Sequence, residues 1–116
     1  MSSDLGTVVF VLRGDVLITI PHFSIYLERS GYSIMTTYRD SLREVLRSEV
    51  FPKAVVVLAS RDTNVYLVNS LIEEFPQLHI VYWYIPGTDS VPLEDARVHL
   101  FSGMSPRELL RIIEEI

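Results

Sequence analysis

The run Ala54–Ala59 (AVVVLA) is apolar at every position, and it limits the fold more than any other segment does. A strand without polar–apolar alternation is buried on both of its faces. Burial of that kind requires a layer of helices on each side of a sheet. The run is therefore predicted to be the central strand of a parallel sheet.

Four more segments are predicted to be strands because they are short and rich in β-branched or aromatic residues. They are Thr7–Leu12, Ser33–Thr37, Ile80–Ile85 and Arg97–Phe101.

Apolar residues at i, i+3, i+4 spacing predict four amphipathic helices. Their apolar positions fall within Phe23–Leu27, Leu42–Leu46, Val68–Phe75 and Leu109–Ile116.

The predicted helices carry recognisable end signals. Ser41–Glu44 and Ser105–Glu108 both match the S-x-x-E capping box, and Gly31 is a natural stop for the first helix. The segment Val16–Ile20 fits either a hairpin strand or the entry to that helix. We favour the helix, because Pro21 then lies in its first turn, where a missing N–H costs nothing.

The element order βαβαβαββα predicts one domain over residues 1–116, with right-handed crossovers covering both faces of the sheet. The expected architecture is a flavodoxin-like α/β three-layer sandwich with five parallel strands in the order 2-1-3-4-5. The connector Pro86–Asp95 has no helical period, so we expect a loop instead of a helix between strands four and five.

Composition excludes several classes of function. Ten Lys and Arg against fifteen Asp and Glu give a net charge of -5, which disfavours binding to nucleic acid or an anionic membrane. The absence of cysteine excludes disulfides, thiolate metal sites and cysteine nucleophiles. No signal peptide or apolar run of about 18 residues is present, so we expect a cytoplasmic protein.

The sequence shows no catalytic, metal or cofactor motif. His22, His79 and His99 lie on separate elements without metal-ligand spacing, and the five glycines form no phosphate loop. No G-x-S-x-G elbow is present. We therefore expect no metal, no cofactor and no enzymatic activity.

Three segments are similar to receiver domains of two-component systems (CheY-like domains). Glu28–Tyr32 (ERSGY) resembles the L-E-x-x-G-Y before their second strand, and Glu73–Leu78 (EEFPQL) resembles their E-E-F-P segment. Ser105–Leu110 (SPRELL) resembles their S-P-x-E-L-L. The resemblance covers nearly the whole chain and implies the receiver fold.

The residues that carry receiver chemistry are missing. By the resemblance, the acidic pair would fall near Leu12–Arg13, the phospho-accepting Asp within Leu58–Ser60, and the lysine on Ser102. The only lysine, Lys53, is expected at the opposite end of the sheet. The chain therefore resembles a non-phosphorylatable pseudo-receiver, a class that is expected to signal through protein contacts.

The edge formed by strands four and five is the candidate interface. We expect Val98 and Leu100 to lie under the C-terminal helix, and one parity of the aromatic run on strand four to be partly covered. The partner would be another protein or a second copy of the chain. Alternatively, the Pro86–Asp95 loop folds over the aromatic side chains. The candidate interface residues are Tyr82, Trp83, Tyr84, Arg97, His99 and Phe101.

The carboxyl-end rim of the sheet offers an alternative site, because flavodoxin-like folds bind ligands there. Two arginines on this rim could hold an anion, so a small-molecule or anion sensor is the second hypothesis. Its aspartates fit turn and N-cap roles better than an acidic pocket. The candidate rim residues are Arg13, Asp15, Arg61, Asp62, Thr88 and Ser102.

Overall fold

The computed structural model describes residues 5–12, 19–48, 51–58, 63–84, 87, 92, 94–103 and 105–116 of the 116-residue chain. For residues 12, 19–21, 63 and 64 it describes the backbone only. The helices and strands are β1 (Thr7–Leu12), α1 (Thr19–Arg29), β2 (Ser33–Tyr38), α2 (Leu42–Leu46), β3 (Ala54–Leu58), α3 (Thr63–Glu74), β4 (Ile80–Trp83), β5 (Val98–Phe101) and α4 (Pro106–Glu114).

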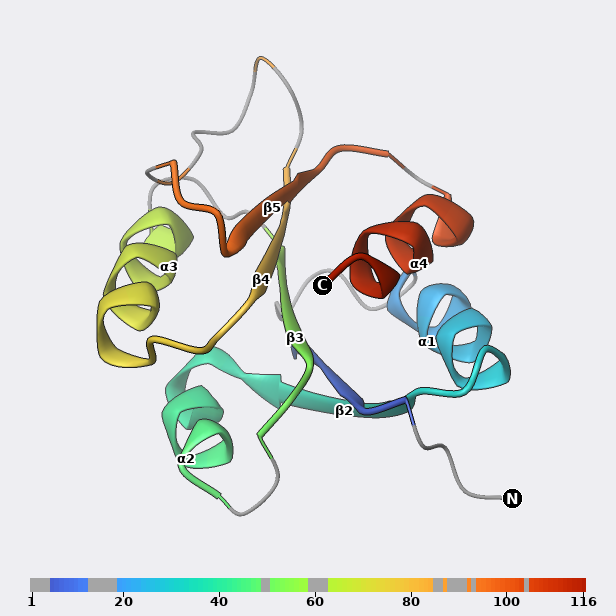
Figure 1. The fold of residues 1–116 in the computed structure, drawn as a ribbon, viewed down its shortest axis with the longest axis horizontal. Coiled ribbons are helices and arrows are strands. Elements are labelled where there is room, and N and C mark those ends of the chain that lie inside the picture. Colours follow the sequence, from blue (N-terminus) through green and yellow to red (C-terminus); the bar gives the residue numbers. More distant parts are fainter. Residues whose placement is uncertain are drawn as a thin grey trace.

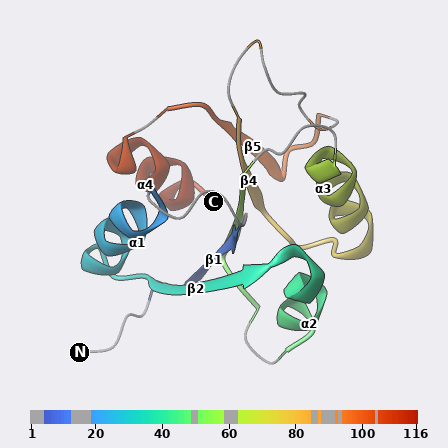
Figure 2. The ribbon, with the colours of Figure 1, turned by 180° about the vertical axis from the view of Figure 1, so that it is seen from behind.

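The five strands form one sheet in the order β2-β1-β3-β4-β5, and every neighbouring pair is parallel. Helices α1 and α4 cover one face of the sheet, and α2 and α3 cover the other (Figure 1). The view from behind shows the same two helical layers (Figure 2). The predicted flavodoxin-like sandwich and its strand order are therefore confirmed.

Two apolar cores flank the sheet. Phe23 of α1 and Leu109 of α4 pack with Val8 and Phe10 on one face. On the other face, Val68 of α3 packs with the intervening β1 residues and with α2. Both parities of β1 and β3 are thus buried, as the continuous apolar runs predict.

The end of α1 follows the predicted glycine stop. The N–H of Tyr32 donates to the carbonyl of Leu27 at 3.2 Å, and the N–H of Gly31 donates to the carbonyl of Glu28 at 3.1 Å. This is the Schellman pattern, and Gly31 adopts the positive φ of 107° that it needs. The favoured helical reading of this segment holds for Thr19 and Ile20, whereas 16–18 lie outside the described residues.

The prediction of two capping boxes is wrong. Ser41 and Ser105 occupy the N-cap positions of α2 and α4, but neither side chain makes a capping hydrogen bond. Ser41 has the helical φ and ψ of the short 3-10 turn Arg39–Ser41 that precedes α2, so its side chain does not reach the first turn of the helix. Pro106 stands at the start of α4 as predicted.

The connector between β4 and β5 is only partly described. Its described residues Gly87, Pro92, Glu94 and Asp95 belong to no helix or strand, which is compatible with the predicted loop. Within the described part of the chain, four α-helices lie around five strands, and α3 is the described helix beside the β4–β5 end of its face (Figure 1).

Candidate interaction surface beside strand β5

The aromatic side chains of β4 are not exposed. Tyr82 is fully buried and Trp83 nearly so, and all four residues of the strand are buried on both faces. The prediction that one parity of the aromatic run is only partly covered is therefore wrong for Tyr82 and Trp83. Tyr84, just after the strand, is half-buried and stacks on Tyr82 with ring centroids 6.4 Å apart.

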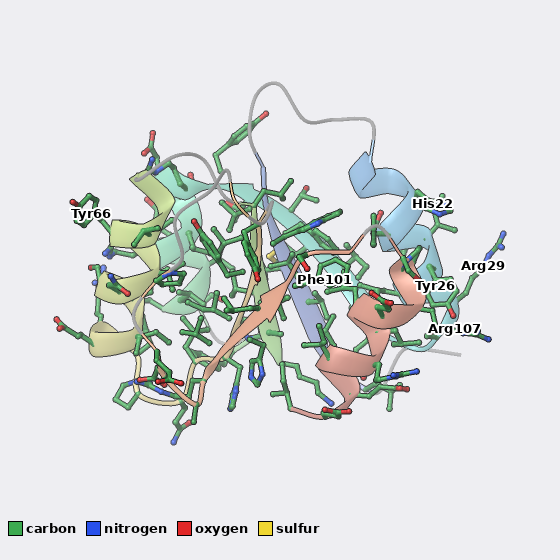
Figure 3. The ribbon with its side chains drawn as sticks, turned by 90° about the horizontal axis from the view of Figure 1, so that it is seen from above. His22, Tyr26, Arg29, Tyr66, Phe101 and Arg107 are labelled. Carbon is green, nitrogen blue, oxygen red and sulfur yellow. The ribbon has the colours of Figure 1, made fainter. Side chains whose placement is uncertain are left out.

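The faces of β5 are the reverse of those predicted. Phe101 is buried in the core with α1 and α4, whereas Val98 packs against the core on the α3 side. Figure 3 shows Phe101 beneath α4 and Tyr66 on the far side of α3. The large ring of Phe101 buries more apolar surface than a valine can, so it decides which face α4 covers.

Leu100 is consequently the exposed apolar residue of β5. It shares the parity of Val98 and lies on the α3 side of the strand, and 48% of its surface is exposed. A helix between β4 and β5 would cover this part of the sheet in a fully helical sandwich. The structure thus leaves a partly uncovered sheet face at Leu100.

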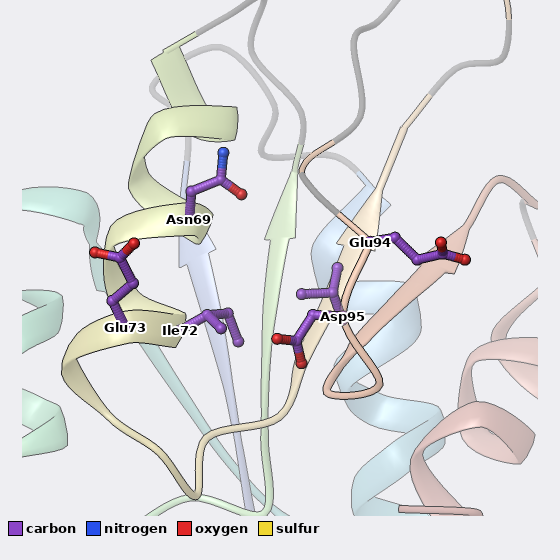
Figure 4. A pocket seen from close by; sticks show the side chains of 6 residues that line it. Asn69, Ile72, Glu73, Glu94 and Asp95 are labelled. Atoms are coloured by element: carbon purple, nitrogen blue, oxygen red, sulfur yellow. The ribbon is translucent and has the colours of Figure 1, made fainter.

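A groove of about 160 Å³ lies between α3 and the start of β5, next to this face (Figure 4). Ile72 and Val98 form its apolar floor. Its rim carries side chains from both walls: Asn69, Glu73, Glu94 and Asp95. We call this groove together with Leu100 the β5 groove.

The β5 groove is acidic. Arg97 offsets one of its three carboxylates: the Arg97 Nε lies 3.1 Å from Asp95 Oδ1, and hydrogen bonding to Arg97 holds the pKa of Asp95 below its usual value. Glu73 and Glu94 are exposed, and neither forms an ion pair with any residue that the structure describes. Two uncompensated negative charges therefore flank an apolar floor.

Arg97 also fixes the shape of this edge. Its Nη1 donates to the carbonyls of Phe75 and Pro76 at 3.1 and 2.7 Å, where α3 ends. The guanidinium therefore connects the residue before β5 with the turn before β4. Arg97 thus has a structural role at this edge, because its side chain is already engaged within the chain.

His99 is half-buried on the α4 side of β5 and is hydrogen-bonded to His79. Burial lowers the pKa of His99, and the neighbouring His79 lowers it further, while Glu115 of α4 acts in the opposite direction. Of the six predicted interface residues, Tyr82, Trp83 and Phe101 thus belong to the core. Tyr84, Arg97 and His99 are partly exposed.

The alternative site at the rim lies almost wholly outside the described residues, which include neither Arg13, Asp15, Arg61, Asp62 nor Thr88. Ser102, at the position of the receiver lysine, is exposed just after β5.

Lys53 lies before β3, with its Nζ 5.6 Å from the centre of the Tyr32 ring. It therefore stands at the amino end of the strands, as predicted. Within the described part of the chain, no group of three or more His, Asp or Glu side chains could hold a metal ion.

Sequence reasoning missed the β5 groove. The sequence pattern predicts that Leu100 lies under the C-terminal helix, and it gives Glu73 no role beyond the resemblance at Glu73–Leu78. One signal is present in the sequence: the acidic pair Glu94-Asp95 ends the connector Pro86–Asp95, just before the strand Arg97–Phe101. Of the described helices, none is both long and apolar enough to cross a bilayer. No family model and no curated protein matches the chain.

Proposed function

We propose that this chain is a non-phosphorylatable pseudo-receiver that acts as a protein interaction module. Its binding site is the β5 groove, and its partner is an amphipathic segment that carries basic residues. The observation that carries the proposal is the groove in which Glu73 and Glu94 line the same hollow as Ile72 and Val98. Leu100, a large apolar side chain that is half exposed, extends the apolar surface along the same face of β5 as Val98. An apolar floor with an acidic rim favours an apolar helix face flanked by Lys or Arg.

The negative charge of the groove and of the whole chain explains why the partner should be basic. Glu73 and Glu94 would attract lysines along the rim of a docked helix, and the net charge of -5 would speed its approach. A groove of about 160 Å³ is too small for most organic ligands, which occupy cavities of roughly 300–1,000 Å³. The size therefore favours a few protein side chains as the occupant.

A peptide titration tests this proposal. The probe is a helical peptide of Leu and Lys with Leu at i, i+3, i+4 spacing, and the comparison peptide has Glu in place of each Lys. We expect the Leu/Lys peptide to shift the amide resonances of Ile72, Val98 and Leu100, and the Leu/Glu peptide to leave them unchanged.

Two variants sharpen the titration. Leu100→Asp should weaken binding of the Leu/Lys peptide at least about tenfold, because it replaces the exposed apolar side chain of the β5 groove with a charge. Ile25→Asp is the matched control, since Ile25 is equally exposed (49%) but lies on α1. Equal binding of both peptides, or equal losses in both variants, would contradict the proposal.

The lack of phosphotransfer is tested separately. Acetyl phosphate with Mg²⁺ should leave the intact mass of the protein unchanged, because the acceptor and lysine positions of the receiver pattern hold other residues. A mass increase of one phosphoryl group would show that this chain is phosphorylated after all.

A further inference from the structure

The second edge of the sheet, β2, has an open side along its whole length. Strand β2 lies at the end of the sheet, and β1 is its one partner among the described strands. Its six residues Ser33–Tyr38 (SIMTTY) include no charge and no proline. Natural proteins usually protect an edge strand with lysine, proline, a bulge or a covering segment. This strand lacks the two protections that sequence can supply.

The side chains of β2 are correspondingly exposed. Tyr38 is 59% exposed and Met35 is 40% exposed, and Thr36 between them is exposed as well. In Figure 1, α1 and α2 lie to either side of the strand. An uncharged, partly apolar edge of this kind is a template for a further strand.

The direction of the backbone fixes which groups the edge offers. The N–H of Ser33 donates to the carbonyl of Gly6 at 2.9 Å, so the peptide groups of Ser33 point toward β1. Because these groups alternate along a strand, Ile34 and Thr36 direct both N–H and C=O outward, and Tyr38 directs its N–H outward. The carbonyl of Tyr38, at the N-cap of the turn Arg39–Ser41, accepts a hydrogen bond from the Thr37 hydroxyl at 3.4 Å. The outward groups are thus centred on Thr36.

This arrangement is self-complementary. In an antiparallel pair with a two-fold axis at Thr36, Thr36 opposes itself and exchanges two hydrogen bonds with its copy. Ile34 opposes Tyr38, whose N–H donates to the Ile34 carbonyl. On the other face of the strand, Met35 opposes Thr37. Every exposed apolar side chain of β2 then meets a β-branched, aromatic or aliphatic partner, and no like charges face each other.

We infer that β2 pairs with β2 of a second copy of this chain, in antiparallel register about Thr36, and joins the two sheets into one. The contact is distinct from the β5 groove, because β1, β3 and β4 lie between the two edges. An interface of a few residues on each strand is small, so the dimer forms reversibly and at high protein concentration.

Charge substitution at Thr36 tests the register. Thr36→Lys and Thr36→Glu each place two like charges at the two-fold axis, so each variant alone should be monomeric in sedimentation at concentrations where the unmodified chain dimerises. An equimolar mixture of the two variants should recover the dimer, because Lys then opposes Glu. This recovery also shows that both variants are folded.

A cysteine pair tests the geometry directly, since the chain contains no cysteine of its own. Directly opposed residues in a hydrogen-bonded antiparallel pair have Cα atoms about 5.5 Å apart, within the range of a disulfide. Under mild oxidation Thr36→Cys should form a covalent dimer. Met35→Cys, which faces Thr37 and not itself, should stay mainly uncrosslinked.

Three results would overturn the inference. They are a monomer at every concentration, a mixture of the two charge variants that stays monomeric, and a dimer abolished by Leu100→Lys but not by Thr36→Lys. The last result would place self-association on β5. Peptide binding at the β5 groove is measured on monomeric protein, so the two proposals fail or succeed separately.

Discussion

The Nδ1 of His79 lies 3.2 Å from the Nε2 of His99, and the two rings are stacked with their centroids 5.4 Å apart. One nitrogen must donate and the other accept, so at least one of the rings is neutral when this bond exists. His79 comes directly before β4 and His99 lies in β5. The pair therefore joins the last two strands of the sheet through a hydrogen bond between two imidazole rings.

This pair predicts a loss of stability in mild acid. The pKa of His99 is lowered in the folded state, chiefly by burial. Between this lowered pKa and the pKa of about 6.5 in the unfolded chain, the unfolded state binds more protons than the folded state. The free energy of unfolding therefore decreases as the pH falls. Urea unfolding followed by circular dichroism should give constant stability above about pH 6.5 and a decline below it.

The matched variants for this prediction are His99→Gln and His22→Gln. His99→Gln should flatten the decline between about pH 6.5 and pH 5, because the titrating group is gone. His22 is exposed on α1, and its replacement should leave the pH profile unchanged. Profiles that remain the same in both variants would show that the histidine pair does not couple to folding.

Arg97 predicts a second stability effect. Arg97→Ala removes the hydrogen bonds to the carbonyls of Phe75 and Pro76 and should lower the free energy of unfolding by about 1–3 kcal/mol. Arg97→Lys should recover only part of this loss, because an ammonium group lacks the planar fork. Arg29→Ala, at an exposed position on α1, should change stability by less than about 0.5 kcal/mol.

The ion pairs between the α2 region and α3 are expected to stabilise α2 locally. The Arg43 Nε lies 2.8 Å from Glu74 Oε1, and Arg47 contacts the other carboxylate oxygen. Hydrogen bonding to Arg43 lowers the pKa of Glu74. The five-residue α2 is too short to be stable by itself, so it depends on such contacts and on its apolar packing.

Glu74→Gln should therefore speed amide hydrogen exchange in α2 more than in α1, with little change in global stability. Because the folded pKa of Glu74 is lowered, its stabilising effect is present above the unfolded pKa of about 4.3 and is lost as the pH falls further. Glu73→Gln is the control, since Glu73 lines the β5 groove and the ion pair of Arg43 is with Glu74. Equal acceleration in both variants would argue against the ion pairs.

Replacing Phe23 should cause the largest loss of stability among these variants. Phe23 is fully buried in the core beneath α1 and α4. Phe23→Ala should cost about 3–5 kcal/mol, because it removes the ring and leaves a cavity. Tyr66, on the outer side of α3, is the control: Tyr66→Ala should cost less than about 0.5 kcal/mol in the same thermal or urea unfolding experiment.

The sheet was predictable because its signal comes from burial. Runs such as AVVVL at Ala54–Leu58 are apolar on both parities, and only a strand between two helical layers satisfies them. The strand order then follows from the right-handed crossovers. The end signals were less informative: Ser41 and Ser105 stand at N-caps without making the hydrogen bond that the motif implies.

The candidate site was less predictable, because it depends on which face of β5 each helix covers. In the run RVHLF the aliphatic Val98 and Leu100 share one parity, whereas Phe101 shares the other with two polar residues. The pattern therefore favoured the wrong face of the strand for α4. Packing against Phe23, 6.3 Å away between ring centroids, decides the direction of Phe101. The groove further requires Ile72 and Val98 to meet across 26 positions of sequence, which no local pattern encodes.

Trp83 is the only tryptophan of the chain, and it lies where four parts of the fold meet. Its ring is 4.5 Å from that of Phe23 in α1 and 5.3 Å from that of Phe101 in β5, and its Nε1 donates to the carbonyl of Gly103 ahead of α4. The fluorescence of Trp83 therefore reports on the packing of α1 and α4 against the sheet. Separation of α1 or α4 from the sheet would expose the indole and move its fluorescence emission to longer wavelength, whereas an event confined to β2 would leave the emission unchanged.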